Sequence, residues 1–304
     1  MNVIRTLSLL QKAYQGFDGV HVMTDEERTR LQKHLLKMYK EIEAVCVKHD
    51  LTVMLAYGSV LGAIRHKGFI PWDDDMDLFM PRKDYELLIN KYADELPDYL
   101  QIYAPNARNK AYGRFAKVID VRTKFIRAGS EDFNDPSQGI FVDIFPLESM
   151  EHRPLKNKVR RFIAMLMMYI GSSVGIYEDK SPNYRRLMRY SVSTRINYWL
   201  RYILGMLFSF VSYQKWMNKI DKFCRNDEET GFVADLLGDY TWKPIPLDVF
   251  TPPVKGEFDG TDVFLPHDSI DHLVRTYGNW QRIPPEEDRM QHFIREIHFY
   301  EGND

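Results

Sequence analysis

The residues best suited to chemistry are the acidic residues that follow Trp72, where the chain reads Asp73-Asp74-Asp75-Met76-Asp77-Leu78-Phe79-Met80. From Asp75 onward the alternation of charged and apolar residues predicts a strand, with Met76, Leu78 and Met80 facing a core. Asp75 and Asp77 would then project together from the opposite face. Two such carboxylates can bind one divalent cation. The alternative is a solvated acidic turn, and for Asp73 and Asp74 a helper role and a solvated turn remain equally open.

A turn at Gly58-Ser59 precedes this acidic segment. The apolar run Leu51 to Tyr57 predicts a strand, and a short helix is expected from Val60. Backbone N–H groups at such a turn, together with the Ser59 hydroxyl, can bind a phosphate. Ser59 could instead only cap the helix, which uses the same geometry.

A third carboxylate, Asp143, lies inside the otherwise apolar run Ile140-Phe141-Val142-Asp143-Ile144-Phe145-Pro146. Burying a lone carboxylate costs several kcal/mol unless it is paired. We therefore predict that Asp143 is a metal ligand or a base. Pairing with an arginine, such as Arg114 or Arg127, is the alternative.

The Gly-Ser turn followed by Asp-x-Asp resembles the signature of the nucleotidyltransferase superfamily. Gly58-Ser59-Val60-Leu61-Gly62 with Pro71-Trp72-Asp73-Asp74-Asp75-Met76-Asp77-Leu78 is similar, more narrowly, to the LicD family, which is named for bacterial phosphocholine transfer and related to fukutin. In the resembled fold a third aspartate, on a strand beside the Asp-x-Asp strand, stands in the place of Asp143. The resemblance covers Leu51 to Pro146 well, and Tyr277-Gly278-Asn279-Trp280 looks like the family's carboxyl end.

The resemblance also implies roles for single basic residues. Lys117 would bind the donor, although an edge-strand lysine fits nearly as well. Arg65 lies between the turn and the aspartates, near enough to meet a diphosphate, and surface solubility explains it as simply. His292 corresponds to a histidine near the family's carboxyl end, with a structural histidine as the alternative.

The helices and strands expected in the rest of the chain would position these residues. Thr24 and Glu27 form a capping box that predicts a helix to about His49, and a helix is expected over Asp84 to Tyr92. Short apolar runs, typical of hairpin-connected sheet, follow at Tyr99 to Tyr103, Tyr112 to Ile119 and Thr123 to Ile126. We predict an α+β fold: a nucleotidyltransferase-like mixed sheet with flanking helices in residues 1–150, a helical basic and aromatic insert in 151–226, and a C-terminal segment packing back on the core in 227–304.

Composition limits the partners and the compartment. The formal net charge is −2, so no global basic field indicates nucleic acid. Between Arg153 and Lys219, however, 13 Lys or Arg stand against 2 acidic residues. The apolar blocks Phe162 to Tyr177 and Trp199 to Trp216 are not clean membrane spans, because Gly-Ser-Ser breaks the first and Arg201 interrupts the second. This insert either lies on an anionic membrane or packs as a lobe with a solvated basic rim.

Two distant cysteines, Cys46 and Cys224, suit a reducing compartment. We therefore expect a cytoplasmic protein, peripheral on the inner face of the membrane if the insert binds lipid.

The resemblance implies a phosphotransferase that moves a phospho-alcohol, phosphocholine or a relative, from a CDP-linked donor to a hydroxyl of a cell-surface glycan or its lipid-linked precursor. Mg²⁺ or Mn²⁺ would be held by Asp75, Asp77 and Asp143, and Gly58 and Ser59 would clamp the donor phosphates. Two alternatives remain: a metal-dependent glycosyltransferase that uses a nucleotide-sugar, and a non-catalytic scaffold on a membrane surface.

Overall fold

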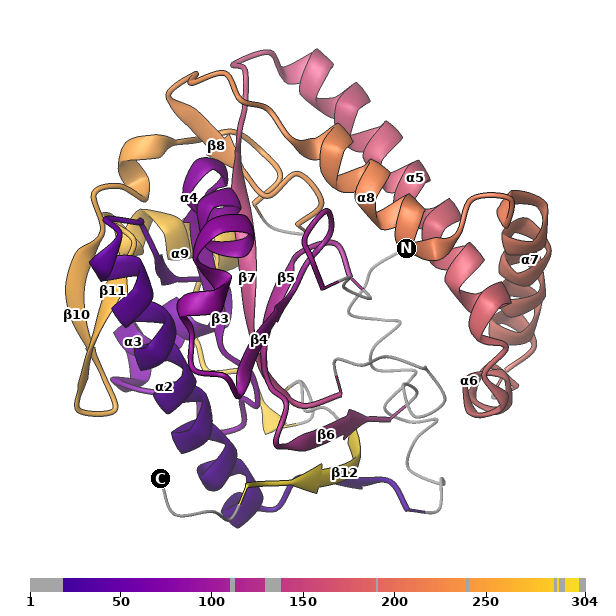
Figure 1. Cartoon of the computed structure of the whole chain (residues 1–304), viewed down its shortest axis with the longest axis horizontal. Coiled ribbons are helices and arrows are strands. Elements are labelled where there is room, and N and C mark those ends of the chain that lie inside the picture. Colours follow the sequence, from indigo (N-terminus) through magenta and orange to yellow (C-terminus); the bar gives the residue numbers. More distant parts are fainter. Residues whose placement is uncertain are drawn as a thin grey trace.

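The computed structural model of the chain describes residues 19–109, 113–128, 138–189, 191–238, 241–286, 289 and 293–300. Helices and strands are mixed along the chain rather than alternating, which confirms the predicted α+β class. Figure 1 shows the main sheet in the middle of the molecule, with α2, α3 and α9 on its left and the helices α5 to α8 grouped on its right.

The main sheet has its strands in the order β2, β3, β7, β5 and β4, and β8 and β9 extend it beside β7. The only parallel pair among these strands is β3 with β7. The strands are β2 (Met54–Leu55), β3 (Asp77–Pro81), β4 (Leu100–Tyr103), β5 (Ala116–Asp120), β7 (Ile140–Ser149), β8 (Phe232–Ala234) and β9 (Ile245–Pro246).

Two smaller sheets complete the β structure of the described residues. β1 (His21–Val22), β12 (Phe293–His298) and β6 (Lys124–Arg127) form one, in that order with β12 in the middle. β10 (Val254–Phe258) and β11 (Thr261–Leu265) form an antiparallel hairpin. The strand expected over Thr123 to Ile126 therefore exists, but it pairs with the C-terminal strand instead of joining the main sheet.

The helix α2 (Asp25–Lys48) begins at the predicted capping box, with Thr24 and Glu27 bonded reciprocally. Its apolar positions Leu31, Leu35, Met38, Ile42 and Val45 are all buried. The helix α3 (Tyr57–His66) starts earlier than the expected Val60. After β3 the chain turns directly into α4 (Arg82–Leu87), which continues as a π-helical turn (Leu88–Tyr92) and a 3₁₀ turn (Ala93–Glu95). The 3₁₀ turn Leu247–Val249 and α9 (Ser269–Tyr277) follow near the C-terminus.

The expected helical insert consists of α5 (Pro154–Asp179), α6 (Pro182–Leu187), α7 (Val192–Phe208) and α8 (Tyr213–Cys224), which we call the helical lobe. The Gly-Ser-Ser that interrupts the first apolar block lies inside α5, which runs through it as one helix. Small residues are needed there for packing: a Cβ on Gly171 would lie 2.9 Å from the Met217 side chain of α8. By length and composition, α5 could cross a membrane.

A buried ion-pair cluster fastens the helical lobe to the sheet. Arg82 of α4 bonds to Glu148 of β7 through Nε at 2.9 Å, and its Nη2 lies 2.9 Å from Asp221 Oδ1 of α8. Asn106 donates to the second oxygen of Asp221 at 2.7 Å. Removing Arg82 would leave the buried carboxylates of Glu148 and Asp221 without the cation that they share.

Candidate active site

Three charged side chains lie in a row across neighbouring strands. The parallel pairing of β3 with β7 sets Asp77 opposite Asp143, and the antiparallel pairing of β7 with β5 sets Asp143 opposite Lys117. The Asp143 backbone N–H also donates to the Met76 carbonyl at 3.0 Å. The expected position of Asp143, on the strand beside the Asp-x-Asp strand, is therefore confirmed. Lys117 Nζ donates to Asp143 Oδ1 at 2.8 Å.

Aromatic rings border this charged row on both sides. Phe79, Phe145 and Phe115 stand two residues away along the same three strands, with ring centroids 6.3 Å apart for Phe79 and Phe145 and 4.2 Å apart for Phe115 and Phe145. On the other side, Lys117 Nζ lies 3.3 Å from the centroid of the Phe141 ring. The rings limit the access of water on these two sides, so charges in this row interact more strongly than they would in bulk solvent.

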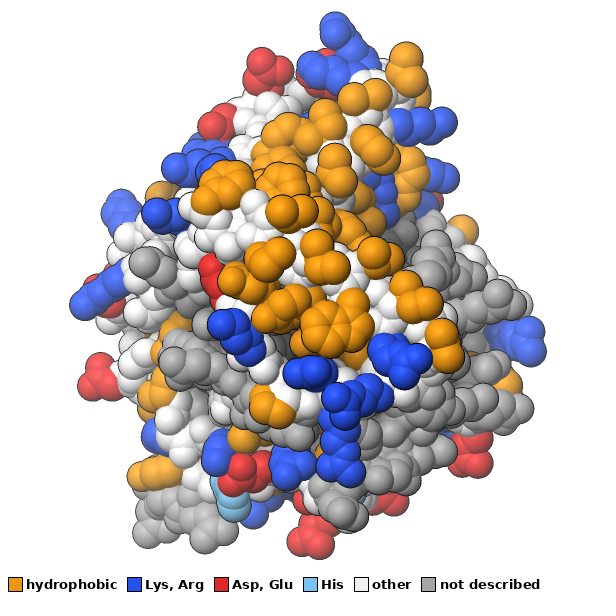
Figure 2. Space-filling model, turned by 90° about the vertical axis from the view of Figure 1, so that its right-hand side faces the viewer, with side chains coloured by type: hydrophobic (Ala, Val, Ile, Leu, Met, Phe, Trp, Pro, Cys, Tyr) orange, Lys and Arg blue, Asp and Glu red, His pale blue; other side chains and the backbone are white. Residues whose placement is uncertain are grey.

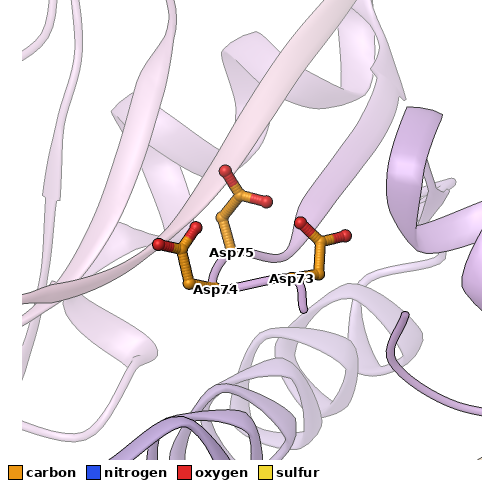
Figure 3. A group of neighbouring side chains, drawn as sticks. All are labelled: Asp73, Asp74 and Asp75. Carbon is orange, nitrogen blue, oxygen red and sulfur yellow. The ribbon is translucent and has the colours of Figure 1, made fainter. Parts of the chain in front are cut away.

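A second group of carboxylates lies immediately before β3. Asp73, Asp74 and Asp75 each offer an oxygen, and these atoms all lie within 4.8 Å of one another. Figure 3 shows the three carboxylates rising from one stretch of chain toward the same side. Asp75 also lies 3.5 Å from Arg127 Nη2. Among the described residues, this is the group whose arrangement already suits a metal ion.

Burial and mutual repulsion set the protonation of these acids. Burial raises the pKa of Asp77 well above its ordinary value, and the nearby carboxylates of Asp75 and Asp143 raise it further. The pKa of Asp73 is raised in the same way, first by burial and then by Asp75 and Asp74. Without a cation, therefore, the segment resists carrying its full negative charge.

The Gly58-Ser59 turn lies directly against the acidic segment. It forms the first turn of α3, and the Ser59 hydroxyl accepts a hydrogen bond from the Asp77 backbone N–H at 3.0 Å. A Cβ on Gly58 would lie 3.2 Å from Asp73 Oδ2, so a glycine permits this close approach. Because the Ser59 oxygen acts as an acceptor here, its own proton remains available for a further acceptor.

Tyr57 is a feature of the site that the sequence did not reveal. Its φ of 41° is in the left-handed region, which a non-glycine residue seldom adopts. Its hydroxyl donates to Asp235 Oδ2 at 2.8 Å and lies 2.8 Å from the Thr241 hydroxyl, while Arg114 Nη1 donates to Asp235 Oδ1 at 2.9 Å. These contacts connect the start of α3 to segments far along the chain, which no local pattern could have indicated.

The other predicted site residues are placed as follows. Arg114 is bonded to Asp235, whereas Lys117 forms an ion pair with Asp143. Arg127, the other arginine considered from the sequence, lies 3.5 Å from Asp75. Arg65 lies in the last turn of α3, and its Nη1 donates to the Trp280 carbonyl at 2.8 Å. Its role in phosphate binding stays a prediction. His292 lies outside the described residues.

Comparison with known proteins gives this geometry a context. Residues 50–161 match the family model described as LicD/FKTN/FKRP, nucleotidyltransferase domain. The chain is 26% identical over 264 residues to the lipopolysaccharide cholinephosphotransferase LicD of Haemophilus influenzae, an alignment that covers 86% of this chain and 94% of the relative.

Shorter similarities extend to two uncharacterised rickettsial proteins. The protein of Rickettsia typhi is 31% identical over 78 residues, 26% of this chain and 24% of its own length. The protein of Rickettsia prowazekii is 30% identical over 78 residues, 26% of this chain and 28% of its own length.

Proposed function

We propose that this chain, which belongs to the LicD family through residues 50–161, is a phosphotransferase. It would transfer phosphocholine, or a related phospho-alcohol, from a CDP-linked donor. The acceptor would be a hydroxyl of a cell-surface glycan or of its lipid-linked precursor. The similarity to the Haemophilus cholinephosphotransferase over most of both chains supports this reaction class. The observation that carries it is the row formed by Asp77, Asp143 and Lys117, with Asp75 and the Gly58-Ser59 turn beside it. The core would then be a nucleotidyltransferase-like sheet.

The residues present fit a divalent cation. Every candidate ligand is a carboxylate oxygen, a donor set that suits Mg²⁺ or Mn²⁺. Asp75, Asp77 and Asp143 would hold the ion, and Asp73 and Asp74 lie close enough to orient them. Burial, and then repulsion by Asp75 and Asp143, raises the pKa of Asp77, and a bound cation would relieve that repulsion. When bound, the ion would neutralise the donor diphosphate and stabilise the departing CMP.

The protein's own groups would bind the donor, accept the acceptor's proton and exclude water. Backbone N–H groups in the first turn of α3 and the Ser59 hydroxyl would bind donor phosphates. Lys117 is held by Asp143 in the absence of donor and would bind a phosphate oxygen when Asp143 turns to the cation. Asp143 would also accept the proton of the attacking hydroxyl. The aromatic rows on both sides would exclude water, which would otherwise compete as the acceptor.

The proposed location is the cytoplasm. Both cysteines are free and buried, and burial raises the pKa of the Cys46 thiol to about 12. Buried neutral thiols of this kind need no oxidising environment.

The decisive experiment combines binding and turnover. Thermal shifts with CDP-choline, CDP-ethanolamine, CDP-glycerol, CDP-ribitol, UDP-glucose and ATP, each with and without Mg²⁺, would identify the donor. The expected result is a Mg²⁺-dependent shift with a CDP-alcohol, followed by release of CMP when a glycan acceptor is added. A response to UDP-glucose alone would instead indicate a glycosyltransferase, and no response to any nucleotide would indicate a scaffold.

A further inference from the structure

The outer face of the helical lobe exposes many large apolar side chains. On α5 they recur at helical spacing, with Phe162 68% exposed and Leu166 48% exposed. On α7 the same spacing gives Leu200 at 60% and Ile203 at 48%. Figure 2 shows that apolar side chains form one band across this face, bordered by Lys and Arg side chains. The band, which we call the apolar face, comprises Leu155, Val159, Phe162, Ile163, Leu166, Tyr169, Val192, Ile196, Trp199, Leu200, Ile203, Met206 and Leu207.

The charge around the apolar face has one sign. From Lys180 to Phe208 the chain contains six Lys or Arg and no Asp or Glu. At one end of the face, a hollow of about 380 Å³ is lined by Arg185, Met188, Arg189, Arg195, Tyr198 and Trp199. The Arg185 guanidinium lies 5.1 Å from the centroid of the Trp199 ring. Arginines beside an interfacial tryptophan suit lipid phosphates above an acyl-chain boundary.

Two arginines of α5 hold this helix with the apolar face outward, one through α8 of the lobe and one through the segment after β8. Arg160 Nη2 donates to the Cys224 carbonyl at 2.6 Å, and Arg161 Nη1 donates to the Leu236 and Gly238 carbonyls at 2.9 and 2.7 Å. These two arginines therefore brace α5 internally instead of facing lipid.

Close helix packing argues against a spanning arrangement for α5, because α8, on which it packs, is tied to the sheet through the Asp221–Arg82 ion pair. A Cβ on Gly175 would lie 2.9 Å from Tyr213 of α8, and one on Gly205 of α7 would lie 2.0 Å from the Ser173 carbonyl oxygen. For α5 to cross a bilayer, the helix would have to give up these contacts. A helix pair with one packed side and one apolar side instead lies in the membrane interface.

We propose that the apolar face is a monotopic membrane-binding surface, which inserts α5 and α7 side chains into an anionic leaflet while the hollow of Arg185, Arg189 and Arg195 binds lipid phosphate. The positive charge around the apolar face favours a membrane over a second copy of this chain. Two copies would bring two strongly cationic rims together, whereas an anionic leaflet complements the charge of one. Membrane binding through this face is independent of the reaction proposed for the carboxylates, so each can fail without the other.

Co-sedimentation with vesicles tests this surface. The full chain is expected to bind vesicles of phosphatidylcholine with 30% phosphatidylglycerol and to bind pure phosphatidylcholine far more weakly. Arg189→Glu with Arg195→Glu should lower the partition coefficient roughly 30-fold or more, because each basic residue near the surface adds about 1 kcal/mol. The matched control is Lys33→Glu with Lys83→Glu, which changes the charge equally at exposed positions of α2 and α4 and should bind nearly as well as the wild type.

The apolar part is tested separately. Leu200→Ser with Ile203→Ser should abolish binding, whereas Ile270→Ser with Val274→Ser on α9, which are 48% and 50% exposed, should not. Brominated lipids should quench tryptophan fluorescence in the wild type and much less in Trp199→Phe. Equal binding to neutral and anionic vesicles would overturn the role of the arginines. If the wild type does not bind vesicles but forms dimers, and Leu200→Ser with Ile203→Ser converts these dimers to monomers, the apolar face is a self-association surface instead.

Discussion

The carboxylate site buries charged side chains, whereas the helical lobe exposes apolar ones. Folding alone favours the reverse in both regions. In the sheet, Asp143 is only 7% exposed, although it carries charge. In the lobe, Phe162 is 68% exposed, although it is apolar. Each arrangement costs stability in the isolated chain. This difference is why we propose different partners for the two regions: ions and phosphates for the carboxylate site, and a lipid leaflet for the helical lobe.

The largest expected effect is on turnover. Asp75→Asn, Asp77→Asn and Asp143→Asn should each reduce CMP release below detection, because each removes a charged ligand with little change in volume. Asp73→Asn should cost about 10- to 100-fold, as a change beside the ligands. Asp98→Asn, at an exposed position, is the matched control and should keep normal activity. Near-normal turnover by Asp143→Asn would refute the three-carboxylate site.

Asp77→Asn and Asp143→Asn should change the stability of the metal-free protein in opposite directions, because the two acids have different neighbours. Asp77→Asn removes a repelled charge and should raise the melting temperature of the metal-free protein. Asp143→Asn removes the partner of Lys117 and should lower it, since a largely buried ammonium would lose its ion pair. Differential scanning fluorimetry in EDTA measures both. Melting shifts of the same sign would show that the pairing of Lys117 with Asp143 does not govern this site.

The next effect concerns pH and Mg²⁺. Because the folded protein raises the pKa of Asp73 and Asp77 above the unfolded value of 3.8, it binds protons that the unfolded chain releases. Their contribution to stability is therefore fully present below about pH 4 and is lost as the pH rises through the folded pKa values. Since Mg²⁺ needs deprotonated carboxylates, its stabilisation should grow over the same range.

Thermal unfolding at pH 5 and pH 7.5, with EDTA or Mg²⁺, measures this dependence. At a Mg²⁺ concentration about 100 times its Kd the stabilisation should approach about 2.7 kcal/mol. The shift should be larger at pH 7.5 and should vanish in Asp77→Asn. An equal shift at both pH values, in the wild type and in Asp77→Asn, would place Mg²⁺ elsewhere on the protein.

A smaller effect is expected when the helical lobe alone is disturbed. Gly205→Val introduces a Cβ that would lie 2.0 Å from the Ser173 carbonyl oxygen, so α5 and α7 must separate at a cost of about 1–3 kcal/mol. Vesicle binding should weaken, while CMP release with a water-soluble acceptor should remain. Leu204→Val, beside Gly205 on the same helix but outside the apolar face, is the control for β-branching. Loss of turnover in Gly205→Val alone would show that the lobe also supports the site.

The two regions also differ in how far the sequence predicted them. The acidic strand, which begins at Asp77 instead of the expected Asp75, the Gly-Ser turn and Asp143 were recognisable from local signals. These signals are strand alternation and a lone charge in an apolar run. The pairing of Lys117 with Asp143 was not, since it depends on which strands become neighbours. The link from Tyr57 to Asp235 was missed for the same reason.

In the lobe, composition indicated helices and basic charge but not which side of each helix would be covered. Arg160 and Arg161 were grouped with the other basic residues of the insert, yet both donate to backbone carbonyls within the protein. Gly171-Ser172-Ser173 was interpreted only as an interruption of an apolar block, although glycine also disfavours helix. Packing against α8 outweighs that preference, and the small side chains are what allow the helices to approach.

The smallest predicted effect compares one cap in each region. Thr24 at the start of α2 and Ser191 at the start of α7 both form capping boxes, with side chains that accept hydrogen bonds from Glu27 N and Thr194 N respectively. Thr24→Ala and Ser191→Ala should each lower the free energy of unfolding by about 1 kcal/mol.

Because α2 packs its buried side into the main core, Thr24→Ala should lower the stability of the whole protein. α7 instead packs chiefly on α5, so Ser191→Ala should raise amide exchange mainly in α7 and leave α2 protected. Hydrogen exchange read residue by residue distinguishes the two, and equal loss of protection in α2 and α7 for both variants would show that the lobe and the core unfold as one unit.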